Sequence, residues 1–136
     1  MNINYSSDGV LMSPEFHDGY LKGIMLEAND QLSLHCEDID GNRGHLLIPN
    51  LVSLRSDNFR QGNIIFEFRV YSGEQIPRRL IAKVEYFVEP VEDSINKRVS
   101  EIAQNGWSLL ELGSSYGCEL LALFDGKPED VKFIAA

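Results

Sequence analysis

The sequence predicts an α+β fold: a mainly antiparallel β-sheet, arranged as a meander that can be strongly curled, with one or two helices packed on one face. Three observations predict this fold. Apolar and polar residues alternate between turn signals through the first half of the chain. Apolar residues then recur at helical spacing after Gly73, and two further strand-like segments follow Gly106.

The chain has 136 residues, of which 43% are hydrophobic. That length suits one domain, and folding at this size buries roughly two-thirds of the surface of the unfolded chain. A hydrophobic core can therefore form without disulfide or metal support. We predict a single domain spanning residues 1–136.

The first hairpin is predicted from residues 20–28 and 31–38. The apolar positions of the two strands are Tyr20, Ile24 and Leu26, with Lys22 interrupting their face, and then Leu32, Leu34 and Cys36. Matching the two apolar faces places Leu26 opposite Leu32. That register requires a loop with an odd number of residues, centred near Asn29.

A second hairpin turn is predicted at Asp40, Gly41 and Asn42, and it leads into the segment HLLIPNLVSLRS. Because Pro49 cannot donate a ladder hydrogen bond, we expect an edge, a bend or a bulge there. The segment NFRQGN predicts another turn, in which Gly62 is free to take a positive φ. The strongest predicted strand, NIIFEFRVYS, follows, because it is rich in β-branched and aromatic residues.

The segment IPRRLIAKVEYFVEP fits a helix and, nearly as well, a strand. The helical positions are Ile76, Leu80, Val84 and Phe87, with Pro77 suited to a first helical turn. The strand alternative uses Leu80, Val84, Tyr86 and Val88. We favour the helix over residues 77–88.

The segment VEDSINKRVSEIAQNG predicts a second helix. Its apolar face comprises Ile95, Val99 and Ile102, its start is expected to be capped by Asp93 or Ser94, and Gly106 fits its end. WSLLEL and CELLALF then predict two more strands. The second of these alternates Cys118, Leu120, Ala122 and Phe124.

The chain is acidic. It has 21 Asp and Glu residues against 12 Lys and Arg, which gives a net charge of −9. Such a charge repels nucleic-acid phosphates and anionic membranes and favours basic partners. The pairs Arg78–Arg79 and Lys97–Arg98 are interleaved with acidic residues, which is typical of solvated helix faces. We therefore expect neither nucleic acid nor membrane as a partner.

The cysteine usage and the N-terminal segment predict a cytoplasmic protein with reduced thiols. Cys36 and Cys118 are too few for a disulfide framework. The segment MNINYSSDGVLMSPEF lacks the basic and then apolar pattern of a signal peptide. Every apolar run is also shorter than the roughly 20 residues that cross a membrane.

His17 and Asp18 raise the question of a catalytic pair. Neighbours on an extended chain point to opposite faces, so Asp18 is not expected to orient the imidazole of His17 as a triad requires. Asp18 before Gly19 instead predicts a turn whose carboxylate accepts hydrogen bonds from nearby backbone N–H groups. We favour this structural role, although His17 is the best candidate for a functional histidine because it lies in a loop.

Two further motifs match a functional pattern only in part. GSSYG, residues 113–117, has the letters of a nucleophile elbow, but the next segment alternates as a strand and all three histidines precede Ser115. DIDGN resembles the start of a calcium loop, but Arg43 stands where glycine is needed and Pro49 where a bidentate glutamate is needed. Both motifs predict turns between strands.

Cys36, His35 and His45 suggest a metal site. If residues 40–41 form the second turn, Cys36 lies opposite His45, and His35 points to the other face. If residues 41–42 form the turn, Cys36 and His45 no longer face each other. Two ligands would still be fewer than zinc requires. We predict a buried, apolar role for Cys36 and no metal site.

Three segments, EFHDGYLKGI, NFRQGNIIFEF and SSYGCELLAL, follow one another along the chain. Together they resemble a family of small uncharacterised bacterial domains with an F-H-D segment, a GN(I/V)(I/V) strand and a SYG(A/C)E strand. Some such domains are similar to immunity proteins, which bind and neutralise a cognate toxin. The resemblance implies a binding role, and it marks as recurrent positions His17, Asp18, Asn58, Arg60 and Asn63.

These observations predict a non-enzymatic, immunity-like module that binds a basic partner protein and needs no cofactor. Its candidate contact residues are His17, Asp18, Asn58, Arg60, Asn63 and Tyr116. One alternative is a small-ligand-binding protein or an enzyme with a pocket near His17, Asp18 and Arg60. Another is a homo-oligomeric structural subunit, such as a homodimer formed through an exposed strand edge or a helix face.

Overall fold

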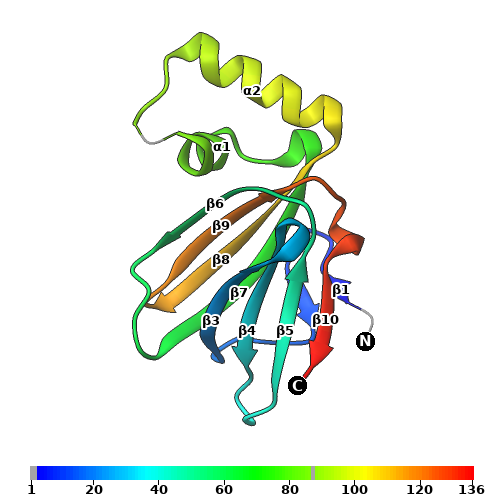
Figure 1. Ribbon diagram of the computed structural model, residues 1–136, viewed down its shortest axis with the longest axis vertical. Helices are drawn as coiled ribbons and strands as arrows, with labels where there is room; N and C mark the ends of the chain where they lie inside the picture. The colour runs from blue at the N-terminus through cyan, green and yellow to red at the C-terminus, as the bar shows by residue number, and fades with distance from the viewer. Residues whose placement is uncertain (1–2, 87) are drawn as a thin grey trace.

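The computed structural model describes residues 3–86 and 88–136, and within them the chain is α+β, as predicted (Figure 1). The elements in chain order are β1 (Asn4–Tyr5), β2 (Leu11–Ser13), β3 (Tyr20–Glu27), β4 (Gln31–Glu37), β5 (Arg43–Ile48), β6 (Leu51–Asp57), β7 (Asn63–Ser72), α1 (Arg78–Glu85), α2 (Glu92–Asn105), β8 (Ser108–Tyr116), β9 (Glu119–Phe124) and β10 (Lys132–Ala135). Eight strands form one antiparallel sheet in the order β10-β5-β4-β3-β7-β8-β9-β6, and β1 pairs with β2. No helix in these residues is long and apolar enough to span a membrane.

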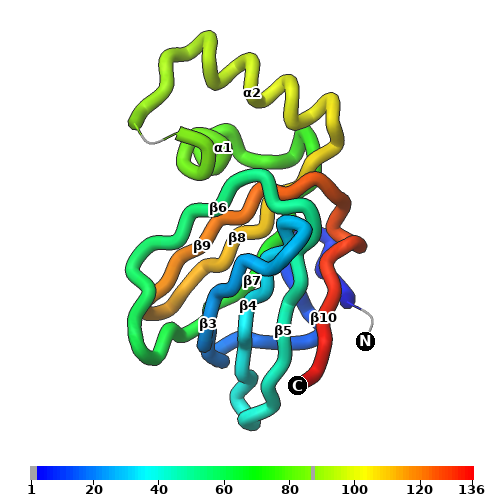
Figure 2. Tube along the Cα trace, in the orientation of Figure 1, coloured from blue at the N-terminus to red at the C-terminus, as the bar shows by residue number. Residues whose placement is uncertain are grey.

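The sheet curls into two layers because its two halves are joined by very little pairing. β3 and β7 share only the pairs Tyr20–Ile64 and Leu21–Asn63. β10, β5, β4 and β3 form the front layer in Figure 1, and β7, β8, β9 and β6 lie behind them. Figure 2 shows the chain crossing from β5 to β6. Pro49 and Asn50 lie in this crossing, with a bend at Asn50, which confirms the bend expected near the proline.

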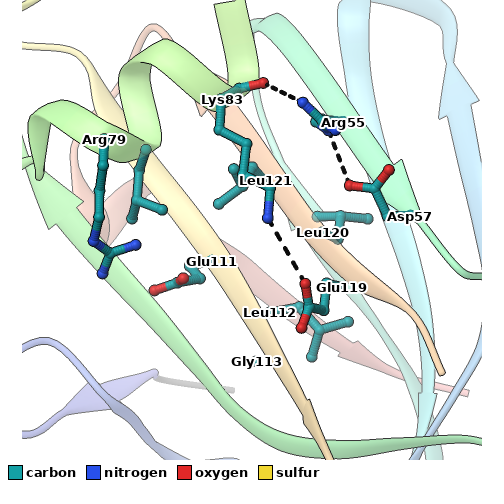
Figure 3. A pocket seen from close by; sticks show the side chains of 11 residues that line it. Arg55, Asp57, Arg79, Lys83, Glu111, Leu112, Gly113, Glu119, Leu120 and Leu121 are labelled. Carbon is teal, nitrogen blue, oxygen red and sulfur yellow. Dashed lines mark hydrogen bonds and ion pairs between the residues drawn. The ribbon is translucent and has the colours of Figure 1, made fainter. Parts of the chain in front are cut away.

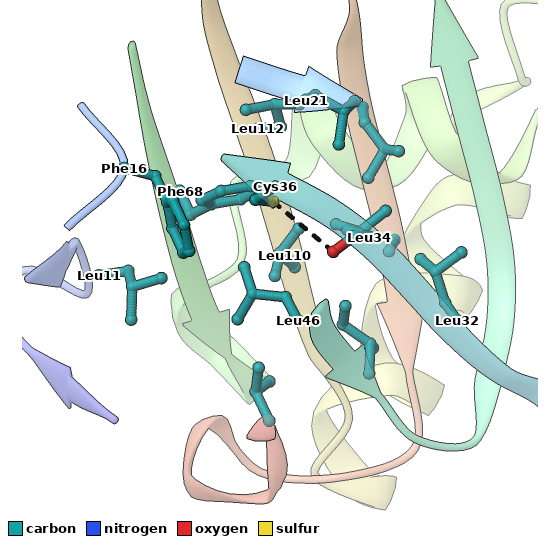
Figure 4. Packing of buried hydrophobic residues seen from close by; sticks show 14 of the residues in the cluster. Leu11, Phe16, Leu21, Leu32, Leu34, Cys36, Leu46, Phe68, Leu110 and Leu112 are labelled. Carbon is teal, nitrogen blue, oxygen red and sulfur yellow. Dashed lines mark hydrogen bonds between the residues drawn. The ribbon is translucent and has the colours of Figure 1, made fainter. Parts of the chain in front are cut away.

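The main hydrophobic core fills the space between the two layers. Figure 4 shows Leu34 and Leu46 of the front layer directed toward Phe68, Leu110 and Leu112 of the back layer. All these side chains are buried. The central strands of both layers therefore place one face in a shared interior.

A second core lies between the two helices and the outer face of the back layer. The buried residues Ile81 and Val84 of α1 and Ile102 of α2 pack with Leu121 and Leu123 of β9. Leu120, Ala122 and Phe124 of the same strand face the main core, so both faces of β9 are covered after the exposed Glu119. This double burial explains why CELLALF is almost continuously apolar.

The helix predicted over 77–88 is confirmed over Arg78–Glu85, and Phe87 lies outside the described residues. The second helix ends at the left-handed Gly106, as expected. Its predicted cap is wrong. α2 begins at Glu92, with Val91 at the N-cap position and no side-chain cap, because the amides of Ser94 and Ile95 both donate to the Val91 carbonyl.

The register predicted for the first hairpin is confirmed, but the prediction that Tyr20 belongs to its apolar face is wrong. Leu26 pairs with Leu32 across a three-residue loop that contains Asn29. A bulge between Leu21 and Gly23 reverses the alternation, so Leu21 is buried in the core and Tyr20 points outward.

The second hairpin has a register that neither sequence alternative predicted. Its loop has five residues, 38–42, because the Asp38 carboxylate accepts hydrogen bonds at 2.9 Å from the backbone amides of both Asp40 and Asn42. Cys36 consequently pairs with Gly44, and the facing Cys36–His45 pair is absent. No group of three or more potential metal ligands occurs in the described part of the chain.

Candidate functional site

The structure gathers the candidate contact residues around the start of β7. Asn63 is the first residue of that strand, and Asn58 and Arg60 lie in the loop before it. Tyr116 pairs with Ile64 on one side of β7. On the other side, the backbone amide of Asp18, next to His17, donates to the Ile65 carbonyl at 2.9 Å.

Asn63 is a buried structural residue at the centre of this region. Its Oδ1 accepts hydrogen bonds from the backbone amides of Arg60, at 2.8 Å, and Cys118, at 2.9 Å. Its Nδ2 donates to the Leu21 carbonyl at 3.2 Å. Because these bonds engage both ends of the amide and the side chain is buried, Asn63 holds three chain segments together instead of facing a ligand.

Gly117 allows the turn between β8 and β9 to approach Asn63. The residue has a φ of +86°, and a Cβ placed there would lie 2.5 Å from Asn63 Oδ1. Only glycine fits both requirements. The motif GSSYG therefore includes the glycine turn between two strands that the sequence predicted, with the exposed Ser115 on the strand side of that turn.

The turn predicted at Asp18 is confirmed, but its side-chain contacts differ from the expectation. Asp18 has a φ of +63°, and the Gly19 amide donates to the Phe16 carbonyl at 2.8 Å. This backbone is not extended, so neighbouring side chains need not point apart. The Asp18 carboxylate lies 3.5 Å from His17 Nε2 instead of bonding to backbone amides.

The surroundings of His17 raise its pKa above the ordinary histidine value. The largest cause is the hydrogen bond that Nδ1 donates to the Phe66 carbonyl at 2.8 Å, because a carbonyl can only accept. The negative charges of Asp18, Glu15 and Glu67 add to this effect. The imidazole is exposed, and no hydroxyl or thiol of the described residues makes a hydrogen bond to it.

A hollow of about 290 Å³ lies beside His17, and we call it the His17 hollow. Its lining residues are Val10, Leu11, Met12, Glu15, Phe16, His17, Phe66, Glu67 and Phe68. Neither Asp18 nor Arg60 lines it. Two large apolar side chains are open to solvent here: Met12 is 54% exposed and Phe66 is 49% exposed.

A second bulge, in β7, explains the exposure of Phe66. In the pairing with β8, register shifts lie between Ile64 and Ile65 and between Ile65 and Glu67, so Phe66 has no partner on β8. Strict alternation would place Phe66 and Phe68 on the same face. Because the bulge falls at Phe66, the two side chains differ instead: Phe68 is buried and Phe66 is exposed. Phe66 then contacts His17 edge-on, with ring centroids 5.5 Å apart.

Acidic side chains surround the His17 hollow. Glu15 and Glu67 line it, and Asp18 lies against His17. Arg69 is within 3.1 Å of Glu67 and 3.7 Å of Asp8, so it offsets part of this charge. Four carboxylates outnumber the two cationic groups of this neighbourhood, Arg69 and a protonated His17, which leaves the hollow negative.

A separate row of apolar and aromatic residues crosses three strands near the start of β7. Tyr20 of β3 pairs with Ile64 of β7, which pairs in turn with Tyr116 of β8. Tyr116 is 53% exposed, and Phe59 in the preceding loop is 49% exposed. Partly exposed aromatic residues of this kind are enriched at the centres of protein interfaces.

A different hollow lies between α1 and the outer face of the back layer, and its charges are balanced. Figure 3 shows its cations Arg55, Arg79 and Lys83 and its acids Asp57, Glu111 and Glu119. Arg55 bonds Asp57 at 2.9 Å, and Lys83 lies 3.8 Å from Glu119. Equal numbers of opposite charges give this hollow no preference for a charged partner.

Sequence reasoning identified His17 and Tyr116 in this region but missed the exposed pair Met12 and Phe66. Phe66 lies in a segment that predicts an ordinary strand, and no sequence signal marks the bulge that exposes its side chain. No family model matches this chain, and neither the curated proteins nor the solved structures include a significant match.

Proposed function

We propose that this chain is a non-enzymatic, immunity-like protein-binding module of the cytoplasm whose acidic surface engages a basic partner protein. The observation that carries the proposal is the His17 hollow, where the exposed apolar side chains Met12 and Phe66 lie beside Glu15 and Glu67. An apolar centre with a charged rim is the usual anatomy of a specific protein interface.

The chemistry of the hollow favours a basic side chain from the partner. The aliphatic stem of a lysine or arginine would pack against Met12 and Phe66, and its cationic end would lie near Glu15. The face of Phe66 adds a favourable cation–π contact when the cation lies within about 6 Å of the ring centroid. The net charge of −9 would attract such a partner from a distance.

The surface row that ends at Tyr116 supports a protein partner over a small molecule. Tyr20, Ile64 and Tyr116 do not line the hollow and form a further apolar row across three strands. A row that spans three strands suits a macromolecule, because small ligands bind where they can be mostly enclosed.

The test is capture of partner proteins from native cell extract on three immobilised forms of the chain. The hollow variant is Glu15→Gln with Glu67→Gln. The matched control is Glu27→Gln with Asp30→Asn, which changes the net charge equally in the exposed β3–β4 loop region. Circular dichroism checks that all three forms are folded.

We expect the wild type and the control to retain the same basic protein, and the hollow variant to lose it. Raising the salt to about 1 M, where the screening length is about 3 Å, should release the captured protein. Equal capture by all three forms, or capture of a partner without a basic surface, would refute the proposal.

A further inference from the structure

The outer face of the front layer carries a cross-strand pair of histidines. His35 of β4 pairs directly with His45 of β5, and the same row continues to Gly23 of β3 and Ile134 of β10. Their neighbours Leu34 and Leu46 point into the core, so both histidines point outward. Both side chains are partly exposed.

The two imidazoles lie close together in a defined geometry. Their ring centroids are 4.1 Å apart and their planes are within 7° of parallel. Both residues lie inside strands that are paired on each side, so the backbone holds them at a fixed separation. Gly23 adds no side chain beyond His35, and that flank of the pair is therefore open.

We propose that His35 and His45 form a two-histidine chelate for a divalent transition metal, with Cu²⁺ preferred. Imidazole nitrogens are good ligands for copper, nickel and zinc, and Cu²⁺ binds a given nitrogen site most tightly in that series. Two nitrogens that each lie about 2.0 Å from one metal ion are about 3 Å apart. Because imidazole lone pairs lie in the ring plane, each ring must rotate out of the stack about its Cβ–Cγ bond, so that the two planes converge on the metal and one nitrogen of each reaches that separation.

The site is open and exchangeable. No third histidine, cysteine or carboxylate joins the pair in the described residues, so water or an external ligand fills the remaining coordination positions. The metal binds the neutral form of imidazole, because the nitrogen that binds it must carry a free electron pair. This site is on the opposite sheet half from the His17 hollow, and it does not depend on the proposed partner.

The test is titration of the metal-free protein with Cu²⁺, followed by calorimetry and by the nitrogen couplings in its electron paramagnetic resonance spectrum. The variants are His35→Gln and His45→Gln. The matched control is His17→Gln, because His17 is the remaining histidine of the chain. We expect one Cu²⁺ per wild-type or control chain, coupled to two imidazole nitrogens.

Either His35→Gln or His45→Gln should raise the dissociation constant for Cu²⁺ at least tenfold. Paramagnetic broadening in the wild-type NMR spectrum should centre on His35 and His45, which tests the site without any substitution. The proposal is overturned if Cu²⁺ binds the pair variants as tightly as the wild type, if the His17 variant loses binding equally, or if broadening centres elsewhere.

Discussion

Replacing Asn63 with alanine should lower the free energy of unfolding by about 2–4 kcal/mol. The Asn63 side chain is 2% exposed and bonds to three backbone groups. The amide of Arg60 belongs to an exposed loop residue and can turn to water. The Cys118 amide and the Leu21 carbonyl belong to buried residues, and leaving each unsatisfied costs about 1–3 kcal/mol. A water molecule entering the space recovers part of that sum.

Urea unfolding followed by circular dichroism measures this loss. The control is Asn105→Ala. Asn105 is the exposed last residue of α2, and its side-chain amide makes a single hydrogen bond, to the Glu101 carbonyl. The control should change the unfolding free energy by no more than about 0.5 kcal/mol. A loss below about 1 kcal/mol for Asn63→Ala, or one equal to the control, would refute the role of Asn63 as the tie between the three segments.

Two further predictions concern the same end of the sheet. Gly62→Ala should lower the free energy of unfolding by about 1 kcal/mol, because Gly62 has a φ of +82° and open surroundings. Gly117→Ala should lower it clearly more in the same urea assay, because the added Cβ would collide with Asn63. Equal losses for the two variants would contradict the packing of Gly117 against Asn63. NMR titration should give His17 a pKa above the ordinary histidine value. The main reason is the Phe66 carbonyl, which accepts the Nδ1 hydrogen, and the Asp18 carboxylate is the second; both favour the protonated imidazole. Because the pKa of His17 is raised in the folded protein, any stabilisation from the protonated imidazole is present at low pH and is lost as the pH rises through this pKa. Asp18→Asn should lower the pKa of His17, because it removes a nearby negative charge.

Much of the fold could be predicted from the sequence because its signals are local. The alternation of Leu32, Leu34 and Cys36 gave the correct register with β3, and Gly106 ended α2 as expected. The bulges near Lys22 and Phe66 could not be predicted, since the apolar pattern does not mark an inserted residue, and the bulge near Phe66 also depends on pairing with β8, which is distant in the sequence. One inserted residue was enough to turn Tyr20 outward and to bury Leu21.

The candidate site was predictable in position but not in composition. Turn chemistry and the family resemblance pointed to His17, Asp18 and Asn63, and the fold places them near the start of β7. Their separate environments come from tertiary structure: Asn63 is buried while His17 is exposed. The stacking of His35 on His45 was likewise hidden, because it depends on a five-residue loop that neither turn interpretation contained.

The most direct measurement of the central claim is the dissociation constant of the captured partner at salt concentrations from about 0.05 to about 0.5 M. We expect the wild type and the Glu27→Gln/Asp30→Asn control to bind it alike, with an affinity that falls steeply as salt increases. The Glu15→Gln/Glu67→Gln variant should bind at least tenfold more weakly at low salt. An affinity that is independent of salt, or equal for the two double variants, would contradict an acidic hollow that binds a basic protein.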